Sequence, residues 1–175
     1  MSKSDLENGK QPVAEKLPAN IEHAAPTGWA VASRSLSEGQ WFWLATVRPD
    51  GQPHVRPILA VLVDDKLHFV SSKSTRKGKN LASSSHCAIT VATDEMHLVV
   101  EGEAAKVQDE ARLRRVADVY ASKYDWPVTV RDGAFYADYG APTAGPPPYE
   151  VYELTPRMAY GFGTEESFSP TRWRF

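Results

Sequence analysis

The sequence predicts a mainly β protein, in which six or so antiparallel strands form a small β-barrel with flanking helices. Short runs rich in β-branched and aromatic residues recur along the chain, with turn signals between them. Two helical patterns occur, one between strands and one after the main set of strands. The length of 175 residues and the hydrophobic content of 42% suit one packed domain.

The domain is expected to begin after a polar N-terminal segment. Residues 1–26 contain prolines and show no periodic apolar face, so we expect a flexible tail there and a single domain over 27–175. The first ordered element of this domain is predicted to be a helical turn over 30–40, which Gly39 ends.

Three strands are predicted to follow as an antiparallel meander. The segment 41–47 is dense in aromatic and β-branched residues, and the Asp50-Gly51 pair after it is a hairpin signal. The chain is then expected to reverse into a strand over 54–63, turn tightly, and form a third strand over 67–72.

The remaining elements alternate between helix and strand. Residues 74–85 are predicted to be helical with Ser74 or Thr75 as the N-cap. Residues 109–124 form an amphipathic pattern whose apolar members recur at three- and four-residue steps. Strands are predicted over 87–93, over 96–107 with a bulge at Gly102, and over 149–163 with an interruption at Pro156.

Charge and cysteine content exclude several classes of protein. The formal net charge of -2 gives no general attraction for nucleic acid or anionic lipid. Cys87 is the only cysteine, so no internal disulfide forms and a cytoplasmic location is expected. No run approaches the roughly 20 apolar residues that cross a bilayer, and the first residues lack the apolar centre of a secretory signal. We therefore expect neither a nucleic-acid partner nor a membrane.

A hydroxyl-rich and basic run marks the junction between the strand over 67–72 and the next helix. Its members are Ser71, Ser72, Lys73, Ser74, Thr75, Arg76, Lys77 and Lys79. A phosphate bound there would meet free backbone N–H groups, hydroxyl donors and positive charge together. The alternative interpretation is a solvated basic helix face, and the spacing of a P-loop is absent. The run by itself predicts an anion site.

The same region resembles the pyridoxamine 5'-phosphate oxidase family of FMN-binding split β-barrels. That family pairs an Arg-x-x-Leu-Leu-Lys strand with a Tyr-Thr-Asn-x-x-Ser-Arg-Lys stretch that follows the next strand. The matches here are Arg56 with Leu59, then Ser71, then Thr75-Arg76-Lys77. Val61 stands where the first motif ends in lysine.

The resemblance implies a site along these two motifs and two further segments. Side chains of the motifs would hold the cofactor phosphate and ribityl chain, while backbone over 57–61 lies along the isoalloxazine ring. The strand MHLVVEG is similar to one in which a glutamine approaches the ring, and the C-terminal YELTPRMAYGFG and TRWRF resemble the family's ending. The cofactor-binding residues implied are Arg56, Pro57, Ile58, Leu59, Val61, Ser71, Ser72, Thr75, Arg76, Lys77, His97, Phe162 and Arg172.

Two of these residues have an equally plain structural interpretation. His97 also suits a strand histidine with a satisfied side chain, and Phe162 suits packing in a core or an interface. Arg172 is the stronger candidate, because the ending TRWRF combines two arginines with two aromatic residues.

By this resemblance the protein is expected to be an oxidoreductase that uses FMN, or alternatively the deazaflavin F420, for hydride transfer to or from a small organic substrate. It is also expected to be a homodimer with the cofactor at the subunit interface. Neither a catalytic side chain nor a metal site is predicted. Vitamin B6 oxidation is not favoured, because GTEESFSPTR lacks the family's substrate-gripping residues. The alternative function is non-catalytic binding or sensing of flavin, F420 or haem.

Overall fold

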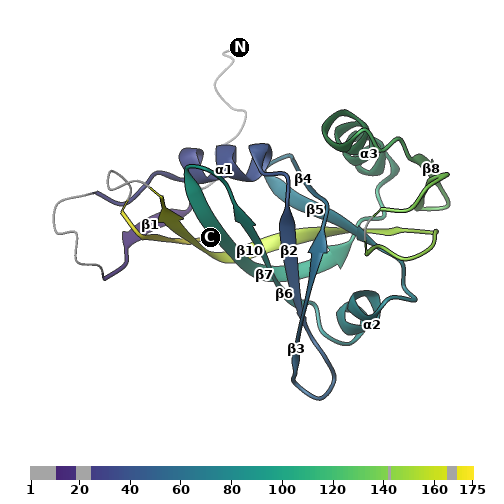
Figure 1. Ribbon diagram of the computed structural model, residues 1–175, viewed down its shortest axis with the longest axis horizontal. Helices are drawn as coiled ribbons and strands as arrows, with labels where there is room; N and C mark the ends of the chain where they lie inside the picture. The colour runs from purple at the N-terminus through teal and green to yellow at the C-terminus, as the bar shows by residue number, and fades with distance from the viewer. Residues whose placement is uncertain (1–10, 19–24, 142, 165–168) are drawn as a thin grey trace, which may run out of the picture.

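The body of the protein is one strongly curved antiparallel sheet (Figure 1). The computed structural model describes residues 11–18, 25–141, 143–164 and 169–175. Its sheet contains β1 (Val13–Lys16), β2 (Phe42–Val47), β3 (Pro53–Ile58), β4 (Ala60–Val63), β5 (Lys66–Ser71), β6 (His86–Ala92), β7 (Met96–Lys106), β10 (Glu150–Gly163) and β11 (Thr171–Arg174). The short strands β8 (Thr129–Arg131) and β9 (Ala134–Tyr136) form a separate hairpin.

The sheet closes only in part, which makes it a split barrel. The strand order is β1-β11-β10-β7-β6-β2-β3, and β5 joins β10 to β4. The predicted strand over 54–63 breaks at Leu59 into β3, which pairs with β2, and β4, which pairs with β5. The barrel is therefore open where these two consecutive strands part, and the predicted fold class is confirmed.

Within the described ranges, three helices flank this sheet. They are α1 (Trp29–Glu38), α2 (Arg76–Ser83) and α3 (Glu110–Tyr124). The Thr75 hydroxyl caps α2 by accepting the amide of Gly78 at 3.1 Å, which confirms one of the two predicted caps. The Asp109 carboxylate caps α3 by accepting the amide of Arg112 at 2.7 Å. Within the described residues, no helix is long and apolar enough to cross a membrane.

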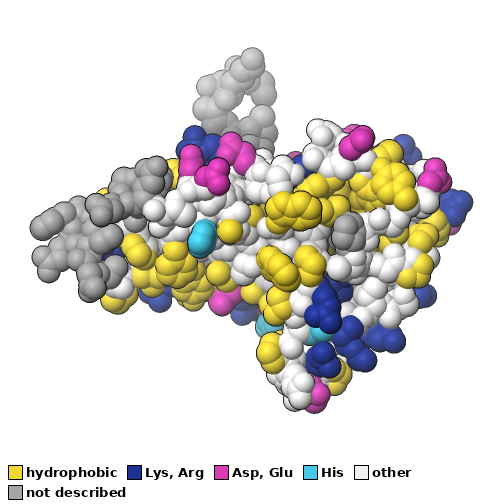
Figure 2. Space-filling view, in the orientation of Figure 1, with side chains coloured by type: hydrophobic (Ala, Val, Ile, Leu, Met, Phe, Trp, Pro, Cys, Tyr) yellow, Lys and Arg dark blue, Asp and Glu magenta, His cyan; other side chains and the backbone are white. Residues whose placement is uncertain are grey.

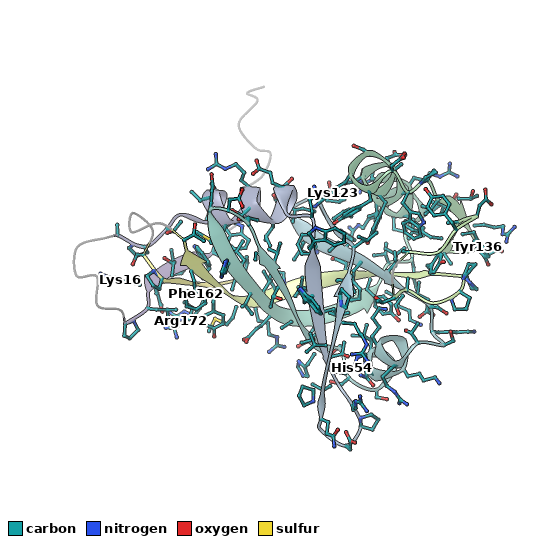
Figure 3. The ribbon with its side chains drawn as sticks, viewed as in Figure 1. Lys16, His54, Lys123, Tyr136, Phe162 and Arg172 are labelled. Atoms are coloured by element: carbon teal, nitrogen blue, oxygen red, sulfur yellow. The ribbon has the colours of Figure 1, made fainter. Side chains whose placement is uncertain are left out.

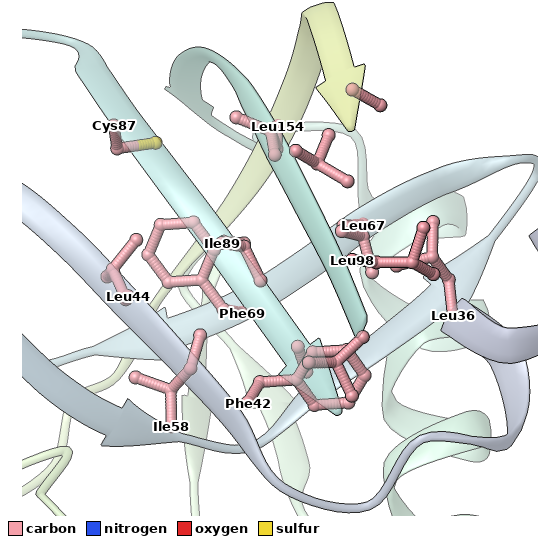
Figure 4. Close-up of a cluster of buried hydrophobic side chains, with 14 of the residues drawn as sticks. Leu36, Phe42, Leu44, Ile58, Leu67, Phe69, Cys87, Ile89, Leu98 and Leu154 are labelled. Carbon is pink, nitrogen blue, oxygen red and sulfur yellow. The ribbon is translucent and has the colours of Figure 1, made fainter. Parts of the chain in front are cut away.

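Two apolar clusters hold the layers together. One fills the barrel, with Phe42, Leu44, Ile58, Leu67, Phe69, Ile89, Leu98 and Leu154 among its members (Figure 4). The other lies under α3 and includes Val61, Val70, Leu113, Val116, Tyr120 and Val151. Strand β5 is almost wholly buried because one of its faces lines the barrel and α3 covers the other.

The number of strands and the extent of the tail need correction. The structure describes eleven strands instead of six or so, because short strands add to the predicted ones. Val13–Lys16, inside the segment expected to be a tail, pairs with β11, and Glu15 forms ion pairs with Arg172 and Arg174. An edge strand offers backbone hydrogen bonds to any extended segment, so no apolar pattern is required. The parts of the predicted tail at 1–10 and 19–24 lie outside the described residues.

The predicted irregularities of two strands also change place. Strand β10 runs through Pro156 without interruption, and its register against β7 shifts between Pro156 and Met158. The bulge is therefore in β10 and not in β7 at Gly102, which lies opposite. A Cβ atom at Gly102 would lie 2.1 Å from the Thr155 carbonyl oxygen, so only glycine allows the two strands this approach.

Candidate functional site

The end of β5 and the start of α2 form a tightly built turn, the anion junction (residues 71–77). The Ser71 hydroxyl lies 2.7 Å from that of Thr75, and both contact the Ser72 carbonyl oxygen. A Cβ atom at Gly78 would lie 2.4 Å from this carbonyl oxygen, so the helix packs directly against the turn. The first amides of α2 have no intrahelical acceptor and carry the positive end of the helix dipole.

Four positively charged side chains lie around His54, beside this junction: Arg48, Arg56, Arg76 and Lys77. Burial lowers the pKa of Lys77 to about 8, with a further contribution from Arg56. Burial, followed by these four charges, also lowers the pKa of His54. None of the four has a carboxylate partner in the described part of the chain. Figure 2 shows basic side chains gathered over α2 and the adjacent β2–β3 hairpin.

Lys77 is the buried member of this group, with 2% of its surface exposed. Its ammonium donates to the carbonyl oxygen of Thr143, whose hydroxyl donates to the carbonyl oxygen of Pro57. Thr143 has a φ of 61°, a strained conformation for a β-branched residue. The next carbonyl, of Ala144, accepts the Ser72 amide at 2.7 Å. The loop at 143–145 therefore packs against the anion junction.

The structure brings most of the predicted residues together. The junction itself contains Ser71, Ser72, Thr75, Arg76 and Lys77, and Arg56 lies close enough to Lys77 to contribute to its lowered pKa, after burial. The segment 57–59 leads from it to the break between β3 and β4, with Ile58 pointing into the barrel. Val61 is fully buried in the cluster under α3.

The other predicted residues lie elsewhere in the same chain. His97 and Phe162 form a cross-strand pair and are exposed. Arg172, on β11, forms an ion pair with Glu15. In Figure 3, Phe162 and Arg172 lie toward the left end of the molecule, away from His54 on the β2–β3 hairpin. One chain therefore does not assemble all the predicted contacts.

The donors at the junction suit a phosphate. The Nε atom of Arg48 is buried without a hydrogen-bond partner, as are the Nε atoms of Arg112 and Arg172 elsewhere in the described chain. Hydroxyls, helix amides and unpaired cations are the groups that bind phosphate esters in proteins. No group of metal-ligating side chains occurs among the described residues.

The sequence alone did not identify Arg48, His54 or Thr143. The alternation of side chains along β3 could have indicated His54, because His54 is two residues from Arg56 and therefore lies on the same face of the strand. Arg48 belongs to the hairpin, where its amide donates to the Gln52 carbonyl oxygen at 2.9 Å. Thr143 reaches the site from a distant loop, so no local pattern indicated it.

Comparison with known proteins agrees with this architecture. The structure is similar to a NimC/NimA family protein from Clostridium acetobutylicum (19% identity, TM-score 0.62, covering 83% of this chain and 91% of that one). It is also similar to a FAD-binding protein from Mesorhizobium loti (16%, 0.56, 93% and 99%) and to an F420 reductase (21%, 0.52, 73% and 94%). At these identities the likeness is one of fold.

No curated protein matches the chain in sequence. The family model for pyridoxamine 5'-phosphate oxidase, in contrast, matches residues 32–162, from within α1 to the end part of β10. This match contains the strands of the barrel that frame the anion junction together with α2 itself. The protein therefore belongs to the pyridoxamine 5'-phosphate oxidase family.

Proposed function

We propose that this protein is a flavin- or deazaflavin-dependent oxidoreductase that holds the phosphate of its cofactor at the anion junction. The observation that carries the proposal is a group of four cations around His54, beside the start of α2: Arg48, Arg56, Arg76 and Lys77. None of them has a carboxylate partner in the described chain. When bound, the ring system would supply hydride transfer to or from a small organic substrate.

The arrangement of the chain around the junction supports a cofactor that extends along β3. From the phosphate position, the backbone over 57–59 runs to the break between β3 and β4. This backbone lies where β3 and β4 part, and Pro57 and Leu59 on it are half-buried. Arg56 and Lys77 would bind the phosphate, while the buried Ser71 hydroxyl and the half-buried Thr75 hydroxyl would fix the turn that presents the helix amides.

We propose further that the protein acts as a homodimer. Trp43 and Val55, on β2 and β3, are 49% and 45% exposed, and Figure 2 shows apolar side chains over this part of the sheet beside the basic patch. Such a surface favours association. A second copy would also bring exposed groups such as His97 and Phe162 to a cofactor that they do not reach within one chain.

FMN is the first candidate for the cofactor and F420 the second. A cavity of about 340 Å³ lies beside the junction and is lined by Lys73, Lys106 and Tyr136 among others. Lys106 pairs with Glu150 at 2.6 Å, and Lys73 lines the same cavity together with Glu150 and Asp132. A cofactor with an anionic tail beyond its phosphate, such as F420, would use this space, whereas FMN would leave it to water.

Two measurements test the proposal. Purified protein is titrated with FMN and with F420, and we expect one of them to bind and to be reduced or oxidised faster with protein in the presence of a substrate panel of enones and quinones. The double variant Arg76→Ala with Lys77→Ala should stay folded and lose at least about tenfold in affinity, since each charge-assisted bond contributes about 1.5–3 kcal/mol. Unchanged affinity in the folded double variant would refute the site. Binding without turnover would indicate a sensing or carrier protein instead.

A further inference from the structure

One residue of a distant loop, Thr143, covers the buried cation of the anion junction. The Lys77 ammonium donates to the Thr143 carbonyl oxygen, and Lys77 is 2% exposed. The Thr143 hydroxyl donates in turn to the carbonyl oxygen of Pro57, the residue after Arg56 on β3. Thr143 therefore bridges the start of α2 and the end of β3, the two segments that are proposed to hold the phosphate.

The residue after Thr143 anchors this cover to the junction. Ala144 is 2% exposed, and its carbonyl oxygen accepts the Ser72 amide at 2.7 Å. The Ala144 amide donates to the Ala141 carbonyl oxygen at 3.2 Å. Ala144 is thus held on both sides, and it is a fixed point about which Thr143 can change conformation.

Thr143 itself is placed to move. Its side chain is exposed, so a turn toward solvent uncovers little apolar surface. Its φ of 61° belongs to the left-handed region, which a β-branched residue rarely adopts, and a change of conformation can relieve this strain. The hydrogen bonds to Pro57 and from Lys77 hold Thr143 in place against the strain.

The Lys77 ammonium cannot serve a phosphate while Thr143 covers it. Because Lys77 is almost fully buried, a phosphate oxygen reaches the ammonium only when the Thr143 carbonyl oxygen leaves. The carbonyl is a neutral acceptor, whereas hydrogen bonds between an ammonium and an ionised phosphate are roughly twice as strong as neutral ones. A phosphate is therefore able to replace the carbonyl oxygen, and in its absence the carbonyl keeps the buried ammonium hydrogen-bonded.

We propose that Thr143 is an internal competitor of the cofactor phosphate: its carbonyl oxygen holds the Lys77 ammonium in the cofactor-free protein, and phosphate binding displaces it. The inference rests on the proposed function, because it requires a phosphate at the anion junction. The apparent affinity is then the intrinsic affinity reduced by the fraction of molecules in which Thr143 is displaced. A substitution that weakens the hold on Thr143 therefore raises cofactor affinity, although it removes a native hydrogen bond.

The test replaces Thr143 by valine, which keeps the shape of the side chain and removes only the hydroxyl that donates to Pro57. Affinity for FMN, or for F420 if FMN does not bind, is measured by titration, and Tm is measured without cofactor. We expect Thr143→Val to bind the cofactor about fivefold more tightly, while the Tm of the cofactor-free protein falls by about 2–4 °C. A residue that only supports the fold or binds the phosphate would lower affinity when it is weakened.

Two further variants check the sign of this effect. Thr143→Asn should bind the cofactor about threefold more weakly, because asparagine adopts positive φ readily and keeps a hydrogen-bond donor. Thr129→Val is the matched control, since it makes the same change at an exposed position of β8. It should leave both affinity and Tm at their wild-type values.

Chemical labelling of Lys77 supplies a measurement that needs no cofactor. Acetic anhydride is added to the cofactor-free protein, and mass spectrometry follows acetylation of Lys77 relative to the exposed Lys79. Thr143→Val should raise this ratio about fivefold, because Thr143 is displaced more often, and Thr129→Val should not change it. Saturating FMN should lower the ratio again in Thr143→Val.

Each outcome separates the inference from the function beneath it. A lower or unchanged cofactor affinity in Thr143→Val overturns the inference, and so does a labelling ratio equal to that of the wild type. If the wild type binds neither FMN nor F420, the proposed function fails together with the inference. If wild type and Thr143 variants bind the cofactor equally well, the proposed function stands and the role of Thr143 does not.

Discussion

Replacing Lys77 by methionine should raise the stability of the cofactor-free protein and weaken cofactor binding. Lys77 is 2% exposed, and burial lowers its pKa from 10.5 to about 8. At about 1.4 kcal/mol per pKa unit, keeping this ammonium charged at pH 7 costs about 3 kcal/mol of folding free energy. Methionine keeps a linear apolar stem of similar length, so the side-chain space stays filled.

Part of this gain in folding stability is offset by a lost hydrogen bond. The ammonium donates to the Thr143 carbonyl oxygen, which the variant leaves without this donor at a cost of about 1 kcal/mol. The net gain of about 2 kcal/mol corresponds to a rise in Tm of roughly 4–8 °C for a domain of this size. Cofactor affinity should fall about 10- to 150-fold, because one charge-assisted bond to phosphate is missing.

The assay is thermal unfolding at pH 7 without cofactor, together with a binding titration of FMN and F420. Lys79→Met, on the exposed face of the same helix, serves as the stability control and should leave Tm within about 1 °C. The pH dependence supplies a second check. The unfolded chain binds more protons than the folded one between pH 8 and 10.5, so wild-type stability contains a component that rises over this window and that Lys77→Met removes. A Tm that falls in Lys77→Met would refute the reasoning that the charge is held there for binding.

Three other predictions follow from named contacts. Cofactor affinity of the wild type should decline between pH 7.5 and 9.5, because Lys77, with a pKa of about 8 before binding, must be protonated to hold phosphate. An affinity that does not change with pH, measured at constant ionic strength, contradicts this prediction. Gly102→Ala should lower the free energy of unfolding by about 2 kcal/mol or more, since its Cβ would lie 2.1 Å from the Thr155 carbonyl oxygen, and Gly28→Ala, with nothing within 4 Å, is the denaturation control. Trp43→Glu should convert the proposed homodimer into a folded monomer in size-exclusion chromatography with light scattering, and an unchanged mass would count against this face as the interface.

Local pattern was enough to predict the elements that frame the site. Alternation and β-branched content indicate β2, β5, β6 and β7, since side chains with a period of two bury one face of a strand. The hydroxyl-rich run at 71–77 indicates both the start of α2 and its chemistry, because a cap such as Thr75 and the free amides after it belong to one short segment.

The sequence by itself therefore determined the class of fold and the anion junction, whose donors are neighbours in the chain. Only the tertiary structure brought Thr143 to Lys77 and Arg48 to His54, broke the strand at Leu59, and placed Lys123 beside Ala60. These contacts join residues far apart in sequence, and their formation depends on how the sheet curves and which helix covers it. Side-chain burial decides the rest, because Lys77 and Lys79 are alike in sequence, yet Lys77 is buried under the loop at 143–145 and Lys79 is exposed.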